Sequence, residues 1–145
     1  MTTELLQFVL DTCVVSELWK PRPAPQVVEW FEQTDEATLG LSVMTVGELQ
    51  KGVDRLPRGR RRTRLTKFVG TFVERFEGRI LPVSVEVARA WGNICAAALN
   101  HGSPMQGIDA LIAATARVHR LTVVTRNVQD FAPSGVMTVN PFEAP

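Results

Sequence analysis

The 145-residue chain has few cysteines, no long hydrophobic run and almost no net charge, and each shortage excludes a class of protein. Its two cysteines, Cys13 and Cys95, are too few for the disulfide framework of a small secreted domain, and no Cys/His spacing matches a zinc site. The apolar residues near the N-terminus are few and are broken by Gln7, which predicts neither a signal peptide nor a membrane span. We therefore expect a cytoplasmic protein with reduced thiols.

The net charge of +1 predicts no partner by itself, but the charges are unevenly placed. One stretch holds eight of the sixteen basic residues and a single acid, Asp54, so it carries +7 and the rest of the chain carries −6. The eight are Lys51, Arg55, Arg58, Arg60, Arg61, Arg62, Arg64 and Lys67. Such a cluster is most often a solvated face, and it would also suit contacts with phosphates or with an acidic partner.

The length and the 45% apolar content suit one compact domain spanning 1–145. Short apolar segments predict strands at about 7–10, 38–42, 79–84 and 121–125, with an edge strand within 135–140. Between them lie helical patterns at 14–20, 27–33, 61–77 and 108–120, and two further helices that Ser42 and Ser84 would cap. Because no short hairpin joins the main strands, we expect an α/β fold of three layers, α/β/α, with a mostly parallel sheet.

Acidic residues recur where this sheet would have its carboxyl edge. Asp11 follows the first strand directly, and Glu48 lies on the helix that leaves the second. Asp109 opens the helix that returns to the strand at 121–125, so its first turn lies over the same edge. Beyond that strand come Thr125, Asn127 and Asp130. Four separate segments therefore direct oxygen atoms to the edge at which α/β sheets bind ligands.

Each acid has an ordinary alternative role, as a turn residue, a solvated helix residue, a carboxylate at the positive end of a helix or a loop residue. Taken together they would form a cluster of like charges that is costly unless it is neutralised. A divalent cation would neutralise it, and carboxylates without histidine suit Mg²⁺ or Mn²⁺. Such ions promote attack of water on a phosphodiester.

Four segments carry a family resemblance. "FVLDTCVVSEL", "LSVMTVGELQKGV", "IDALIAATARVHRLTVVTRNVQDF" and the closing "VNPF" resemble, in order, the landmarks of the PIN-domain family, and in particular of VapC-type toxins. The resemblance implies a Mg²⁺- or Mn²⁺-dependent endoribonuclease of a type II toxin–antitoxin pair, usually a homodimer, with RNA as substrate and a VapB-type antitoxin as partner. Cleavage is expected to leave 5′-phosphate and 3′-hydroxyl ends.

The same resemblance assigns roles to individual residues. It implies that Asp11, Glu48 and Asp109 are metal ligands and catalytic residues, with Asp130 as a further catalytic acid. The supporting residues it implies are Thr12, Ser16, Thr125 and Asn127. Two positions depart from the family pattern: Cys13 replaces a usual Asn, and Asn127 replaces an Asp that many members have. The number of metal ions and the choice between Asn127 and Asp130 as a fourth ligand stay open.

Other functions fit the sequence less well. A haloacid-dehalogenase-like phosphatase needs a second Asp two residues after the first, where this chain has Cys13, and a phosphoacceptor module needs an acidic pair where it has Asp11-Thr12. A PIN-like scaffold that binds RNA or protein without cleaving stays as the non-enzymatic alternative. Arg58, Arg60, Arg61, Arg62, Arg64 and Lys67 are expected to contact RNA or antitoxin, and large apolar residues such as Trp19, Trp30 and Phe31 are candidates for a dimer interface.

Overall fold

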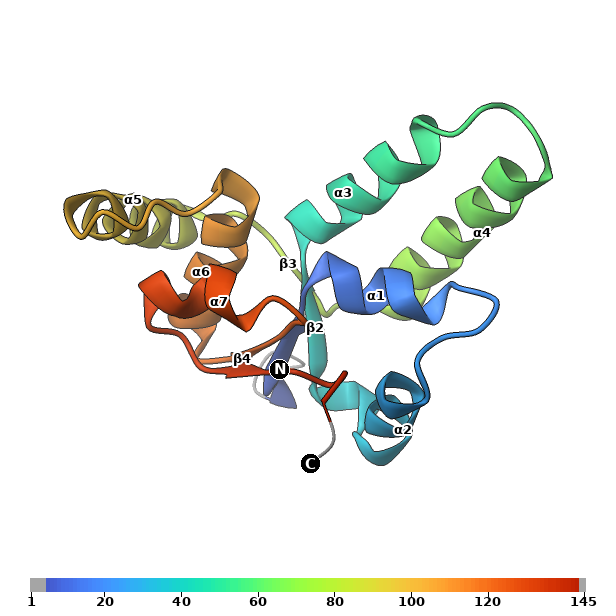
Figure 1. Ribbon diagram of the computed structural model, residues 1–145, viewed down its shortest axis with the longest axis horizontal. Helices are drawn as coiled ribbons and strands as arrows, with labels where there is room; N and C mark the ends of the chain where they lie inside the picture. Colours follow the sequence, from blue (N-terminus) through green and yellow to red (C-terminus); the bar gives the residue numbers. More distant parts are fainter. Residues whose placement is uncertain (1–4, 144–145) are drawn as a thin grey trace.

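The structure is a computed structural model that describes residues 5–143, and its centre is a five-stranded parallel sheet (Figure 1). The strands are β1 (Phe8–Leu10), β2 (Leu39–Ser42), β3 (Ile80–Leu81), β4 (Thr122–Val124) and β5 (Thr138–Val139). Their order in the sheet is β3-β2-β1-β4-β5, with Val9 of β1 opposite Gly40 on one side and Val123 on the other. The predicted parallel sheet is confirmed.

Helices cover both faces of the sheet, which confirms the three-layer α/β/α prediction (Figure 1). On one side lie α1 (Thr12–Leu18), α2 (Pro25–Gln33), α3 (Val43–Asp54) and α4 (Arg60–Arg75). On the other lie α5 (Val85–Asn100), α6 (Gly107–His119) and the short α7 (Val128–Phe131). Two 3₁₀ turns, η2 (Glu36–Thr38) and η3 (Ala132–Ser134), complete the described elements. No helix among residues 5–143 is both long and apolar enough to cross a membrane.

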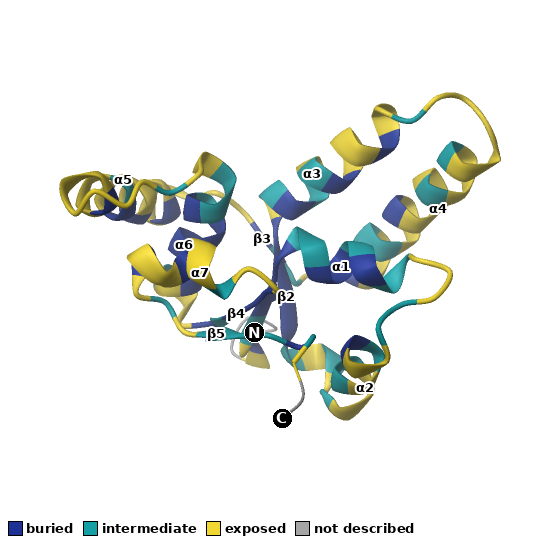
Figure 2. Cartoon of the chain, viewed as in Figure 1, coloured by how far each residue is buried: buried dark blue, intermediate teal, exposed yellow. Residues whose placement is uncertain are grey.

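The two apolar cores follow from the alternation of side chains along the central strands. Val9 and Val123 face a cluster formed with α5 and α6, whereas Leu10 and Val124 face a cluster formed with α1 to α4. All four side chains are buried, as the dark ribbon of the central strands shows (Figure 2). Strands buried on both faces read as continuous apolar runs, which is why "FVL" and "TVV" show no polar alternation.

Helix starts agree with the capping residues in the sequence. The Ser42 hydroxyl accepts a hydrogen bond from the Met44 N–H, and the Ser84 hydroxyl accepts one from the Val87 N–H, each at 3.1 Å. Both predicted caps are therefore confirmed. The first helix begins earlier than predicted, at Thr12, because Asp11 caps it by accepting from the Thr12 N–H at 2.8 Å.

Two predicted segments differ in the structure. The strand expected at 79–84 is reduced to Ile80–Leu81, because Pro82 has no N–H to continue the ladder. The "RNVQD" segment, expected as a loop, forms most of the four-residue α7, which is too short to show a helical period.

The candidate interface aromatics are partly buried and pack against the core. Trp30 packs edge-on against Phe8 and Phe31, and Trp19 packs against Phe68 and Phe72 of α4. Trp19, Trp30 and Phe31 are only partly buried, so their place in a dimer interface stays a prediction.

Strand β1 lies at the point where the order of the sheet reverses. The chain runs from β1 through α1 and α2 to β2 on one side, and β4 pairs with β1 on the other. Open α/β sheets bind ligands in the crevice beyond the carboxyl ends of such strands. In this chain, those ends carry Asp11 and Thr125.

Candidate active site

Asp11 is buried at the carboxyl end of β1, and three donors hold its carboxylate. The Thr12 N–H reaches Oδ1 at 2.8 Å, and the hydroxyl of Thr125, just beyond β4, reaches Oδ2 at 2.8 Å. The Cys13 thiol donates a weaker bond to the same Oδ2 at 3.4 Å. The backbone fixes the turn, because the Asp11 N–H bonds to the Val124 carbonyl oxygen at 2.9 Å. The carboxylate is thus preorganised by the first residues of α1 and by the residue that follows β4.

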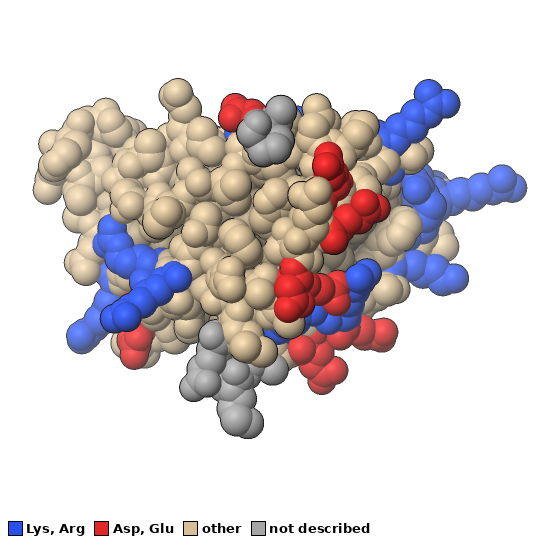
Figure 3. Space-filling model, turned by 90° about the horizontal axis from the view of Figure 1, so that it is seen from below, with Lys and Arg blue, Asp and Glu red and all other residues tan. Residues whose placement is uncertain are grey.

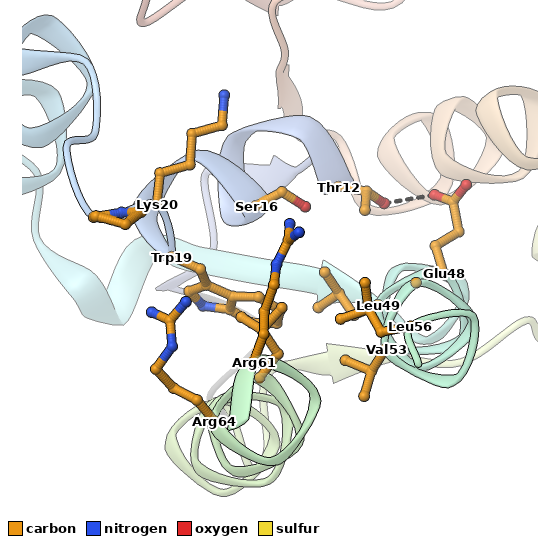
Figure 4. Close-up of a pocket in the computed structure, with 13 residues that line it drawn as sticks. Thr12, Ser16, Trp19, Lys20, Glu48, Leu49, Val53, Leu56, Arg61 and Arg64 are labelled. Carbon is orange, nitrogen blue, oxygen red and sulfur yellow. Dashed lines mark hydrogen bonds between the residues drawn. The ribbon is translucent and has the colours of Figure 1, made fainter. Parts of the chain in front are cut away.

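Glu48 comes to the site from α3 and meets the first residue of α1. The Thr12 hydroxyl donates a hydrogen bond to Glu48 Oε1 at 2.5 Å (Figure 4). Residues 12 and 48 are far apart in sequence, so this bond ties the two helices together beside Asp11. It places the two predicted acids at one edge of the sheet.

The pKa of Asp109 indicates that the predicted acids lie near one another. Burial is the main reason that the pKa of its carboxyl rises from the ordinary 3.8 to about 6. The negative charges of Asp11, Asp130 and Glu48 raise it further, in that order. Three acids from three other segments therefore act on the carboxyl group of Asp109.

The acids are not arranged as a finished coordination shell. Within residues 5–143, no three His, Cys, Asp or Glu side chains are close enough together to hold one ion as they stand. The hydrogen bonds explain the separation, because Glu48 turns to Thr12 while Asp11 is held by Thr125 and Cys13. The donors themselves suit Mg²⁺ or Mn²⁺, since the cluster offers carboxylate oxygens and its mutual repulsion would be relieved by a cation.

Cys13 replaces the Asn that is usual in the resembling family, and the structure shows what it does there. Its sulfur bonds Asp11 Oδ2 and lies 3.8 Å from the Thr125 hydroxyl oxygen. Burial raises the pKa of the thiol to about 11, and the Asp11 carboxylate adds to the rise. The thiol therefore stays protonated near neutral pH and acts as a weak hydrogen-bond donor.

The segment after β4 supplies two different kinds of contact. The Asn127 N–H donates to the Thr125 hydroxyl at 2.9 Å, so Asn127 supports the site through its backbone. Its side chain makes no capping bond to α7. Asp130, on α7, is exposed and borders the same hollow as Asp109. Of these two candidates for a fourth ligand, Asp130 is the one whose charge reaches Asp109.

A groove of about 520 Å³ opens beside Glu48 between α1, α3 and α4 (Figure 4). Its apolar wall includes Trp19, Leu49, Val53, Leu56 and Leu65. Thr12 and Ser16 line it from α1, which brings the predicted Ser16 to the site. Arg61 and Arg64 supply positive charge, whereas the Lys20 ammonium is paired with Glu17 Oε1 at 2.9 Å. The Arg61 guanidinium is directed across the groove toward α1 (Figure 4).

The basic stretch divides into two faces. Arg61 and Arg64 line the groove beside Glu48, whereas Arg58, Arg62 and Lys67 line a separate open hollow of about 450 Å³. Seen from below, basic side chains project from the right-hand edge of the molecule, the side on which α4 lies in Figure 1 (Figure 3). Arg61 and Arg64 therefore share their groove with Glu48, and Arg58, Arg62 and Lys67 do not.

Lys20 also lines the groove, although it was not predicted from the sequence. Thr12, Ser16 and Lys20 recur every four residues, the spacing of one helix face, and that period was the available signal. The signal was weak because Pro21 ends the segment one residue later.

Comparisons with known proteins agree with the fold. The model of the PIN domain family matches residues 8–132, so the chain belongs to the PIN-domain family. It is 38% identical to the VapC ribonuclease Y4jK of Sinorhizobium fredii, over 93% of this chain and 97% of that protein. It is 37% identical to the toxin FitB of Neisseria gonorrhoeae, over 92% and 97%.

A solved structure of FitAB bound to an IR36 DNA fragment superimposes with a TM-score of 0.91 at 34% identity, covering 96% of this chain and 98% of that one. The resemblance to VapC-type PIN-domain proteins is therefore confirmed.

Proposed function

We propose that this chain is the toxin of a type II toxin–antitoxin pair and a metal-dependent endoribonuclease. The observation that carries the proposal is the meeting of four acids from separate segments. Burial, and then the charges of the other three acids, raise the pKa of Asp109 to about 6. The relatives support the reaction class, since one of them is named a VapC ribonuclease. A PIN-like scaffold that binds without cleaving would not need this costly cluster.

The residues that would hold Mg²⁺ or Mn²⁺ are Asp11, Glu48 and Asp109, with Asp130 at the border of the site. Glu48 would have to turn from the Thr12 hydroxyl, which leaves that hydroxyl free to contact the substrate. When bound, the ion would supply positive charge that stabilises the developing charge on the phosphate. The proton that Asp109 holds below about pH 6 has to leave before a cation binds.

The other site residues position groups. Thr125 and Cys13 donate to one oxygen of Asp11 and leave the carboxylate oriented, which reduces the reorganisation needed during reaction. In the groove, Arg61 and Arg64 would neutralise RNA phosphates close to Glu48. Water would attack the phosphorus, giving 5′-phosphate and 3′-hydroxyl products.

The proposed partner is a VapB-type antitoxin. Similar solved structures include a FitAB complex and VapBC from Salmonella typhimurium. The groove combines an apolar wall with the cations of Arg61 and Arg64, so a segment carrying apolar and acidic side chains would fit it. Such a segment would occupy the space beside Glu48 and keep RNA from the acids.

We also propose a homodimer, on the family resemblance and on an apolar surface other than the one expected from the sequence. Val85, Trp91 and Leu99 are exposed along α5. Exposed apolar residues on one helix suit association with a second chain. A monomeric mass in solution at micromolar concentration would exclude this dimer.

The direct test uses the purified chain without antitoxin. Labelled RNA is incubated after removal of metal by a chelator and again after addition of Mg²⁺ or Mn²⁺. We expect fragments with 5′-phosphate ends only when the cation is present. RNA binding without fragments under both conditions would favour the scaffold alternative and contradict the enzyme.

A further inference from the structure

A second hollow borders Asp109 and Asp130, and the proposed reaction assigns no role to it. Its volume is about 440 Å³, within the range of small-molecule sites. The loop before α6 forms one side through Ser103, Pro104, Met105 and Gln106, and the segment from α7 into η3 forms the other through Gln129, Ala132 and Pro133. Asp109 and Asp130 lie in its wall. We call it the Gln106–Gln129 hollow.

The charge of this hollow differs from that of the groove beside Glu48. None of the described residues lining the Gln106–Gln129 hollow is Lys or Arg, and two are acids. A phosphate would be repelled there, whereas the groove offers Arg61 and Arg64. An RNA whose phosphate lies at the acids continues on both sides of them, so the part entering this hollow has to be uncharged.

The uncharged parts of RNA are its bases and sugars, and the lining suits a base. The side-chain amides of Gln106 and Gln129 are exposed, and neither makes a hydrogen bond within the described part of the chain. Each amide offers both a donor and an acceptor, the combination that reads the edge of a base. Pro104, Met105 and Pro133 add apolar surface against which the face of a base can lie.

We propose that the Gln106–Gln129 hollow binds one unpaired nucleobase of the RNA substrate, next to the bond that is cut, and that the two glutamines select the base. The proposal rests on the proposed ribonuclease function for the position of the bond, but the base site itself does not need cleavage. It also places the selectivity on the side of α6 and α7, away from the basic stretch.

The first experiment measures base preference. The chain and the double variant Gln106→Ala, Gln129→Ala cut an RNA library of randomised sequence in the presence of Mn²⁺, and the ends of the fragments are sequenced. We expect the unaltered chain to prefer one base at a position flanking the cut by roughly fivefold to a hundredfold, the range of a paired amide contact. In the double variant this preference falls toward one.

The matched control is Gln33→Ala. Gln33 is an exposed glutamine on α2 whose amide bonds Glu29, and it lies on the other side of the sheet. Its replacement should leave the preference unchanged. An identical preference in the double variant and in the unaltered chain would overturn the proposal, and thermal unfolding of each variant shows that the fold is retained.

The second experiment needs no cleavage. Each of the four ribonucleosides, which carry no phosphate, is titrated into ¹⁵N-labelled protein, and the side-chain amide signals of Gln106 and Gln129 are followed. They are assigned from the single variants. We expect one nucleoside to shift both signals and to leave that of Gln33 in place. No shift with any nucleoside would overturn the proposal.

The two experiments separate this proposal from the ribonuclease itself. Nucleoside shifts in a chain that cuts no RNA would retain the base site and reject the enzyme. Cleavage with no shift and an unaltered preference would retain the enzyme and reject the base site.

Discussion

The molecule holds two clusters of like charge that are built in opposite ways. The acids Asp11, Glu48, Asp109 and Asp130 come from four segments and meet at one edge of the sheet. The basic stretch from Arg58 to Lys67 comes from one continuous segment. Hydrogen bonds hold Asp11 and Glu48, whereas Arg62 is the only member of the basic stretch with a described ion pair, to Asp54 at 3.7 Å.

This difference indicates that the two clusters have different functions. Burial and mutual repulsion destabilise the charged form of these acids, as the raised pKa of Asp109 indicates. Such destabilisation is typical of a site that performs chemistry. The exposed cations are not destabilised in this way, and they can act on any nearby anion. We therefore expect replacements in the first cluster to change the reaction and those in the second to change binding.

The largest effect is expected from Asp11→Asn. The variant keeps a side chain that can cap α1 but removes the charge at the centre of the site. RNA cleavage should fall by at least about a hundredfold, measured with labelled RNA in Mn²⁺, while the melting temperature changes little. Asp35→Asn is the control, because Asp35 caps η2 away from the site. Equal cleavage rates in the two variants would contradict the assignment of Asp11.

Thr125→Val should have the next largest effect, because it removes a buried hydroxyl that bonds Asp11 and the Asn127 N–H. We expect about 1–3 kcal/mol less stability in denaturant unfolding. The affinity for Mn²⁺, measured by calorimetry, should fall roughly tenfold to a hundredfold. Thr115→Val, a buried threonine whose hydroxyl bonds the Leu111 carbonyl oxygen, should lose stability without losing Mn²⁺ affinity.

A pH series tests the raised pKa of Asp109, which comes first from burial and then from the neighbouring acids. Because the pKa of Asp109 is raised to about 6 in the folded chain, its contribution to stability is present below the unfolded value of 3.8 and is lost as pH rises through about 6. Without metal, Asp109→Asn should therefore gain stability relative to the unaltered chain between pH 4 and pH 7, measured by thermal unfolding. A difference that does not change with pH would show that the pKa of Asp109 is not raised.

The smallest effect concerns the two faces of the basic stretch. Arg61→Ala with Arg64→Ala removes two cations from the groove, and the slope of log affinity for single-stranded RNA against log salt should become shallower by about 1.4. Arg58→Ala with Lys67→Ala removes the same charge from the separate hollow. A shift in slope only with the first pair would locate the RNA in the groove, and equal shifts would extend its path to both faces.

Much of this arrangement was available from the sequence. The apolar runs and caps predicted the parallel sheet, and Asp11 was placed correctly because a strand end fixes the position of the next residue. The short α7 was harder to predict, because four residues show no helical period and Asn127 makes no capping bond. The hydrogen bond from Cys13 and the two faces of the basic stretch depend on side-chain directions, which a linear pattern does not contain.

The first turn of α4 has a consequence for local opening. Gly59 offers no side chain to cap it, and Arg60, Arg61 and Arg62 place positive charge at the positive end of the helix. The amide hydrogens of this turn should therefore exchange with solvent faster than those of α3, which Ser42 caps. An anion seated on the turn would slow that exchange, so deuterium uptake at residues 60–63 would report occupancy of this end of the groove whether the anion is RNA or an acidic protein segment.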